Sequence, residues 1–121
     1  MEIRAKAVKD LVLKMKSNYR KRAEQADTIH AEIKCSPYPV LVCGDFNDTP
    51  ASYTYHRVRK DLVDGFHDCG SGYQYTFRQL YKLWRIDYVF YSESLKGCEC
   101  YSPETSYSDH NMVVWKGIAN R

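Results

Sequence analysis

The chain has 121 residues, of which 44% are hydrophobic and 27% charged, with a formal net charge of +3. This composition is typical of a single globular domain, and it excludes an intrinsically disordered chain. The sequence has no signal-peptide pattern and no apolar run near the ~20 residues of a membrane helix, so the chain as written is expected to be soluble. The compartment is not indicated, because a longer parent protein could be exported or membrane-anchored.

Residues 5–34 are predicted to be helical, because they contain no Gly or Pro and their apolar residues recur at helical spacing. Between two apolar stripes lies the polar stretch SNYRKR, residues 17–22. It fits either a break between two helices or the solvated face of one helix, and we favour one long or kinked helix. The prolines of CSPYP, residues 35–39, then end the helix, because proline lacks an N–H donor.

A short apolar strand is predicted at residues 40–43, and such a run is typical of a central strand covered on both faces. A second helix is expected to start at Pro50, with Thr49 as its N-cap, and to end near Gly65. Further along the chain, apolar and polar residues alternate, which predicts strands joined by short loops. The predicted strand segments are YTFRQLY (75–81), WRIDYVFYS (84–92), GCECYS (97–102) and NMVVWKGI (111–118).

The segment GDFNDTP, residues 44–50, places oxygen-bearing side chains directly after the predicted central strand. Asp45 and Asn47 are two residues apart, so both side chains can point to one side of an extended backbone. A carboxylate beside an amide offers a base or metal ligand next to a hydrogen-bond donor, which suits a phosphate ester. The alternative is a polar turn that Asp45 and Asn47 favour, with Asp48 capping the following helix.

Two further segments carry candidate site residues. Asp87 interrupts the apolar strand 84–92, and a buried carboxylate there needs a partner. Arg85, on the same face, would be a purely structural partner. The alternative partner is His110, which follows Asp109 just before the last strand. Asp87 could hold one ring nitrogen of His110 and leave the other free to act on a phosphate.

The remaining reactive residues are interpreted as structural or solvent-exposed. The five cysteines show no disulfide framework and are expected to be mostly free thiols. A zinc site built from Cys69, Cys98 and Cys100 is disfavoured, because a C-x-C pair lacks the usual spacing and a fourth ligand is not evident. The basic residues of segment 14–22 are expected to form a solvated helix face, with a nucleic-acid-binding helix as the rival interpretation.

Three motifs, in their order and spacing, resemble the C-terminal half of the endonuclease/exonuclease/phosphatase superfamily, the DNase I-like hydrolases. They are GDFNDTP (44–50), RIDYVFYS (85–92) and YSDHNMVVW (107–115). The resemblance implies an α/β fold: half of a four-layer DNase I-like α/β sandwich, with one mostly antiparallel sheet and helices on its outer face. Residues 1–121 would then form a single domain fragment.

The resemblance also implies roles for individual residues. Asp45 resembles the aspartate that activates or positions the attacking water, and Asn47 the asparagine that contacts the scissile phosphate. Asp87 resembles the acid that hydrogen-bonds the catalytic histidine, and His110 resembles that histidine. Asp109 resembles an aspartate near the divalent metal, so Asp109 and Asp45 are the predicted ligands of a Mg²⁺ or Mn²⁺ ion.

The reaction implied by the resemblance is hydrolysis of a phosphodiester or phosphomonoester of unspecified type. Family members are commonly longer, with an N-terminal half whose glutamate metal ligand has no counterpart here. The isolated chain is therefore expected to bind the ion weakly and to show little or no activity. Its sheet should expose an apolar face that pairs in a homodimer or, alternatively, with the missing half. The alternative function is a non-catalytic interaction or nucleic-acid-binding module that retains the fold.

Overall fold

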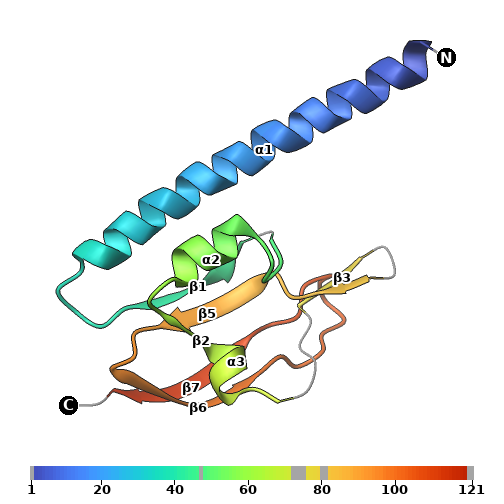
Figure 1. Cartoon of the computed structure of the whole chain (residues 1–121). Coiled ribbons are helices and arrows are strands. Elements are labelled where there is room, and N and C mark those ends of the chain that lie inside the picture. Colours follow the sequence, from blue (N-terminus) through green and yellow to red (C-terminus); the bar gives the residue numbers. More distant parts are fainter. Residues whose placement is uncertain (1, 47, 72–75, 80–81, 120–121) are drawn as a thin grey trace.

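The computed structural model describes residues 2–46, 48–71, 76–79 and 82–119. The helices in this part of the chain are α1 (Glu2–Cys35), α2 (Tyr53–Arg59) and α3 (Gly65–Cys69). The strands are β1 (Leu41–Asp45), β2 (Val63–Asp64), β3 (Phe77–Gln79), β4 (Lys82–Trp84), β5 (Asp87–Tyr91), β6 (Leu95–Tyr101) and β7 (Val114–Ala119). Figure 1 shows α1 beside α2 and β1, with its N-terminal part projecting beyond them and with β6 and β7 on the side away from it.

All described strand pairs are antiparallel. Strand β5 lies between β1 and β2 in a three-stranded sheet, whereas β3–β4 and β6–β7 form two-stranded sheets. The predicted α/β class with antiparallel strands is thus confirmed. The backbone hydrogen bonds distribute these strands over three sheets, where the sequence led us to expect one.

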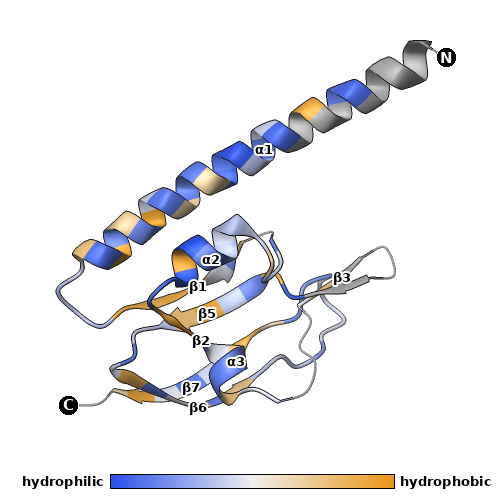
Figure 2. Cartoon of the chain, in the orientation of Figure 1, coloured by the Kyte–Doolittle hydropathy of each residue, from blue (hydrophilic) through white to orange (hydrophobic). Residues whose placement is uncertain are grey.

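The core lies between α1, α2 and one face of the β1–β5 pair. Its buried side chains are Ala26 from α1, Tyr55 and Val58 from α2, Leu62 from the segment after α2, and Tyr88 and Phe90 from β5. The Tyr55 and Phe90 rings meet edge-on with their centroids 5.4 Å apart, a favourable aromatic geometry. In Figure 2 hydrophobic residues are concentrated in β1 and the end of β5, whereas α1 is mostly hydrophilic. Helix α1 therefore packs through a narrow apolar stripe.

The long first helix is confirmed as one continuous element that includes the polar stretch 17–22. Ion pairs connect its C-terminal half to the following segments: Arg22 Nε lies 3.0 Å from Asp48 Oδ2, and Arg57 Nε lies 2.8 Å from Asp27 Oδ1. Among the described helices, none combines the length and the apolar character that crossing a membrane requires.

Strand β1 is less buried than the sequence predicts. It lies at the edge of its sheet, next to β5 alone, so it is not the central strand. Val42 packs against the core, but Leu41, Cys43 and Asp45 on the opposite face are exposed. The prediction was wrong because an apolar run identifies side chains that avoid water without identifying the layers that cover them.

Helix α2 begins at Tyr53, three residues later than predicted, because Ser52 is its N-cap. The Ser52 side chain accepts a hydrogen bond from the Tyr55 N–H at 3.1 Å. Thr49 instead forms a turn in which its carbonyl accepts from the Ser52 N–H at 3.0 Å. The region up to Gly65 is also not one helix, because β2 separates α2 from α3.

Candidate active site

The register of the β1–β5 pair places two carboxylates next to each other. Strand β1 ends at Asp45, β5 begins at Asp87, and the antiparallel register pairs these residues directly. The Phe46 N–H extends the pairing by donating to the Ile86 carbonyl at 2.9 Å. Asp87 therefore starts its strand, so the prediction that it interrupts a strand over residues 84–92 was wrong. Directly opposite residues point to the same face, so both carboxylates lie on one face at one end of the sheet.

The imidazole of His110 completes this group. Its Nδ1 lies 2.9 Å from Asp87 Oδ2, and its Nε2 lies 3.8 Å from Asp45 Oδ2. One potential ligand atom from each of the three residues lies within 4.8 Å of the other two. The structure thus brings together Asp45, Asp87 and His110, as the sequence predicts, where β1 ends and β5 begins.

The segment Thr76–Phe77 holds His110 from another side. Phe77 and His110 form an isolated antiparallel β-bridge, and their ring centroids are 5.0 Å apart. The His110 N–H also donates to Ser108 Oγ at 3.1 Å. Sequence reasoning did not select Phe77 as a site residue. The YTFR pattern indicates a strand there, but only the bridge reveals that this strand contacts the histidine.

The charges around His110 favour its protonated form. The hydrogen bond with Asp87 is the main cause that raises the pKa of His110 above its ordinary value of 6.5. Partial burial opposes this shift in pKa, and the negative charges of Asp87, Asp45 and Asp109 reinforce it. Because the pKa is higher in the folded chain, protonated His110 stabilises the fold below about pH 6.5, and this stabilisation is lost as the pH rises through the folded pKa.

Replacing Asp87 with asparagine is expected to lower the pKa of His110, because the amide removes the negative charge that the imidazolium contacts at 2.9 Å. Titration of the His110 ring signals by NMR, in buffer containing a chelator, measures this change. Asp109→Asn is the matched control. Of the three carboxylates that raise the pKa of His110, Asp109 contributes least, so its replacement should lower this pKa less than Asp87→Asn does. Equal pKa values in wild type and Asp87→Asn would contradict the assigned contact.

Two predicted site residues are not placed in this group. Asn47 lies outside the described residues, so its contact with a phosphate stays a prediction. Asp109 is exposed, with its Oδ1 3.4 Å from Ser108 Oγ, and it is not a member of the three-residue group. The helix-cap alternative for Asp48 is wrong, since Ser52 caps α2 and Asp48 binds Arg22.

Arg85 is not the partner of Asp87. Its guanidinium binds Asp64 of β2, with Nη2 2.8 Å from Oδ2 and Nη1 2.9 Å from Oδ1. It also lies over the Tyr88 ring, 4.9 Å from the centroid. The purely structural explanation of Asp87 as an Arg85 salt bridge is therefore wrong, because the observed partner of Asp87 is His110.

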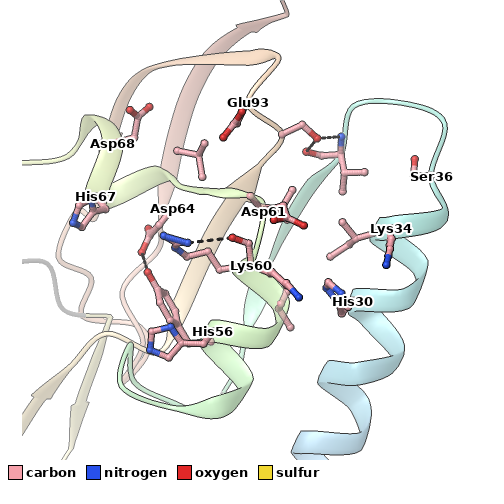
Figure 3. A pocket seen from close by; sticks show the side chains of 18 of the residues that line it. His30, Lys34, Ser36, His56, Lys60, Asp61, Asp64, His67, Asp68 and Glu93 are labelled. Carbon is pink, nitrogen blue, oxygen red and sulfur yellow. Dashed lines mark hydrogen bonds between the residues drawn. The ribbon is translucent and has the colours of Figure 1, made fainter.

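A separate groove of about 1080 Å³, lined by both polar and apolar side chains, lies between the C-terminal end of α1, α2 and the β2–α3 segment (Figure 3). Charged side chains of both signs line it: Lys34, Lys60, Asp61 and Glu93. Asp64 lines it too, but this carboxylate is already bound by Arg85. None of the three clustered residues Asp45, Asp87 and His110 lines the groove. The candidate active site is thus a different surface.

The five cysteines are free thiols, as predicted. Cys98 is exposed and Cys100 is buried, and the register of β6 shifts between Gly97 and Glu99. Within the described ranges of the chain, the one cluster of His, Cys and acidic residues that could hold an ion is the Asp45–Asp87–His110 group. The cysteines therefore contribute no metal site there.

The paired strands β1 and β5 and the segment before β7 bring two carboxylates close to an imidazole. Such a group is suited to general acid–base catalysis of hydrolysis. Comparison with known proteins agrees with this class. The chain belongs to the endonuclease/exonuclease/phosphatase family, whose family model matches residues 16–110. Among curated proteins, none matches the chain significantly.

Solved structures share the fold. An endonuclease/exonuclease/phosphatase from Bacteroides vulgatus is 25% identical with a TM-score of 0.71, and the match covers 82% of this chain and 44% of that one. A mannosyl-6-phosphatase from Bacteroides thetaiotaomicron is 21% identical with a TM-score of 0.66, covering 82% and 46%. A conserved protein of unknown function from Enterococcus faecalis is also 21% identical, with a TM-score of 0.68, covering 84% and 46%. The chain thus spans less than half the length of these structures.

Proposed function

We propose that this chain carries part of the active site of a divalent-metal-dependent phosphoesterase that hydrolyses a phosphodiester or a phosphomonoester. The observation that carries the proposal is the contact of 2.9 Å between Asp87 Oδ2 and His110 Nδ1. Asp87 is the first residue of β5, and it lies opposite Asp45, the last residue of β1. A carboxylate that holds one imidazole nitrogen fixes the tautomer and the ring orientation, and this directs the other nitrogen at a substrate.

In the proposed mechanism, Asp87 positions His110 and favours its protonated form. The distance of 3.8 Å between His110 Nε2 and Asp45 Oδ2 exceeds a hydrogen bond, so the Nε2–H group can donate to a phosphoryl or leaving-group oxygen of the substrate. Asp45 is the base that accepts a proton from, or orients, the attacking water. Asn47 is assigned to the scissile phosphate from its sequence motif alone.

The oxygen donors of Asp45 and Asp109 would hold a Mg²⁺ or Mn²⁺ ion, which prefers carboxylate ligands. Such an ion neutralises charge on phosphoryl oxygens and lowers the pKa of bound water. Asp87 is largely committed to His110, so this chain offers few ligands of its own. Affinity for the ion is therefore proposed to be weak in the isolated chain, with little or no turnover.

We propose that the exposed face of β1 is covered by a second layer in the active protein. Leu41 and Cys43 on this face are exposed in line with Asp45, so a covering layer would also enclose the site. The solved structures are more than twice as long as the parts that match, which favours a complementary half as the occupant. Analytical ultracentrifugation tests the other occupant, because a dimer at micromolar concentration would favour a second copy of this chain.

Hydrolysis of p-nitrophenyl phosphate and bis-p-nitrophenyl phosphate tests the proposed function and distinguishes the two ester classes. The mannosyl-6-phosphatase of the same fold is a reason to include the monoester. We expect little turnover by the chain alone and Mg²⁺- or Mn²⁺-dependent turnover by a folded chimaera that joins it to the N-terminal part of the Bacteroides vulgatus relative. Absence of turnover of either ester by that chimaera would contradict the proposal.

The alternative function, a nucleic-acid-binding module, is favoured by the exposed basic residues Lys16, Arg20 and Lys21 of α1. Arg22 is already paired with Asp48, and Glu24 follows close by, so the basic surface is small. DNA binding that weakens steeply with salt and is indifferent to Mg²⁺ would favour this alternative.

A further inference from the structure

Thr76 is completely buried and lies where the segments that carry Asp87 and His110 meet. Its Oγ1 accepts two backbone hydrogen bonds, from the Ile86 N–H at 3.0 Å and the Asp87 N–H at 3.1 Å. The side chain of Thr76 therefore fixes the backbone position of Asp87, the first residue of β5 and the one that contacts His110.

The backbone of Thr76 fixes the segment that carries His110, the other residue of this contact. The Asn111 N–H, one residue after His110, donates to the Thr76 carbonyl at 2.6 Å. The next residue, Phe77, forms the β-bridge to His110 and places its ring 5.0 Å from the imidazole. One buried residue thus connects, through side chain and backbone, the two chain segments whose side chains meet in the site.

Thr76 supports β5 at the end where the strand has fewest hydrogen-bonded neighbours in its sheet. Strand β2 pairs with β5 only at Phe90 and Tyr91, so near Asp87 the edge of β5 opposite β1 is not paired with a described strand. Backbone N–H groups that are buried without an acceptor are costly, and Thr76 Oγ1 supplies that acceptor for both residues.

We propose that Thr76 is a positioning residue of the active site, which sets the place of the Asp87 carboxylate relative to the His110 ring. The inference rests on the proposed function for its importance to catalysis, but the geometry that it predicts can be measured without substrate. A generic buried threonine would contribute to stability without any specific effect on the Asp87–His110 contact.

Thr76→Val tests the proposal, because valine has nearly the same shape and lacks the acceptor oxygen. Thr76→Ser keeps the oxygen and is the conservative rescue. Val58→Ala, on the core-facing side of α2, is the matched control for a general loss of stability, since Val58 is buried away from the site. All variants are studied as the full chain.

Two NMR measurements separate positioning from stability. We expect hydrogen exchange of the Ile86 and Asp87 amides to accelerate at least about tenfold more in Thr76→Val than in Val58→Ala. In Thr76→Val both amides lose their buried acceptor, whereas Val58→Ala leaves that acceptor in place. We expect the low-field Nδ1–H signal of His110, the signature of its contact with Asp87, to disappear in Thr76→Val and to persist in Thr76→Ser and Val58→Ala.

The proposal is overturned if Thr76→Val folds and keeps both the low-field signal and protected amides, or if Thr76→Ser loses them. If Thr76→Val does not fold, the protection of the Ile86 and Asp87 amides in the wild type and in Thr76→Ser tests the proposal instead. Unprotected Ile86 and Asp87 amides in either protein would overturn the proposal, and protection in both would support it. None of these outcomes depends on turnover, so a failure here is distinct from a failure of the proposed phosphoesterase.

Discussion

Replacing His110 with glutamine in the folded chimaera is expected to lower kcat for phosphate-ester hydrolysis by about 10²–10⁴-fold, the usual contribution of a general acid or base. Glutamine can still donate a hydrogen bond but cannot carry the proton that the Asp87–His110 contact stabilises. KM should change much less, because the lost interaction is stronger in the transition state than in the bound substrate.

His56→Gln is the matched control for this experiment. His56 is exposed on α2 and lines the separate groove, outside the Asp45–Asp87–His110 group, so its replacement should leave kcat within about twofold of wild type. Asp87→Asn should reduce kcat in the same direction as His110→Gln, and the double variant should lose little more than the worse single variant, since the two residues act as one unit. A His110→Gln enzyme with wild-type kcat would exclude the role proposed for this imidazole.

Replacing Arg85 with leucine is expected to destabilise the chain by about 3–5 kcal/mol, because it leaves a buried carboxylate without its cation. Burial disfavours ionisation of Asp64, but the hydrogen bonds from Arg85 and Tyr55 outweigh burial and lower the pKa of Asp64. Removing Arg85 also removes its packing over the Tyr88 and Phe66 rings. Urea denaturation followed by circular dichroism measures the change in the free energy of unfolding.

Lys116→Leu provides the comparison for Arg85→Leu. It breaks the Lys116–Glu99 pair, whose 3.4 Å contact joins side chains that are 61% and 54% exposed. Such an exposed pair contributes only about 0–1 kcal/mol, so this variant should unfold close to wild type. If both variants lost the same small amount of stability, the buried Arg85–Asp64 pair would not stabilise the fold as predicted here.

The convergence of Asp45, Asp87 and His110 was predicted from the resemblance of the three motifs, since the sequence pattern alone placed Asp87 inside a strand at residues 84–92. In the structure Asp87 begins β5 and lies opposite Asp45 at the end of β1, so the register brings the two carboxylates together. The histidine required one further fact, the bridge between Phe77 and His110. That bridge joins residues far apart in the chain, and neither periodicity nor the resemblance of motifs indicated it, since the resemblance concerned only the Asp87–His110 contact.

Other features were not predictable because they depend on competition between distant groups. Arg85 lies two residues from Asp87, yet it binds Asp64, which offers a buried carboxylate and surrounding aromatic rings. Ser52 and Thr49 are both suitable N-cap residues, and the turn that joins them decides which one caps α2. The exposure of β1 likewise reflects which layers lie against it, and a strand's own sequence does not contain that information.

Titration of the isotopically labelled chain with Mn²⁺ tests most directly whether these three residues form one site, because paramagnetic broadening reports even weak binding by proximity. We predict that signals of the proposed ligands Asp45 and Asp109, and of the neighbouring Asp87 and His110, broaden first and together, and that Asp45→Asn suppresses this broadening. Broadening that centres instead on Asp61 and Glu93 of the separate groove, while the His110 ring signals stay sharp, would contradict the assignment of the metal site.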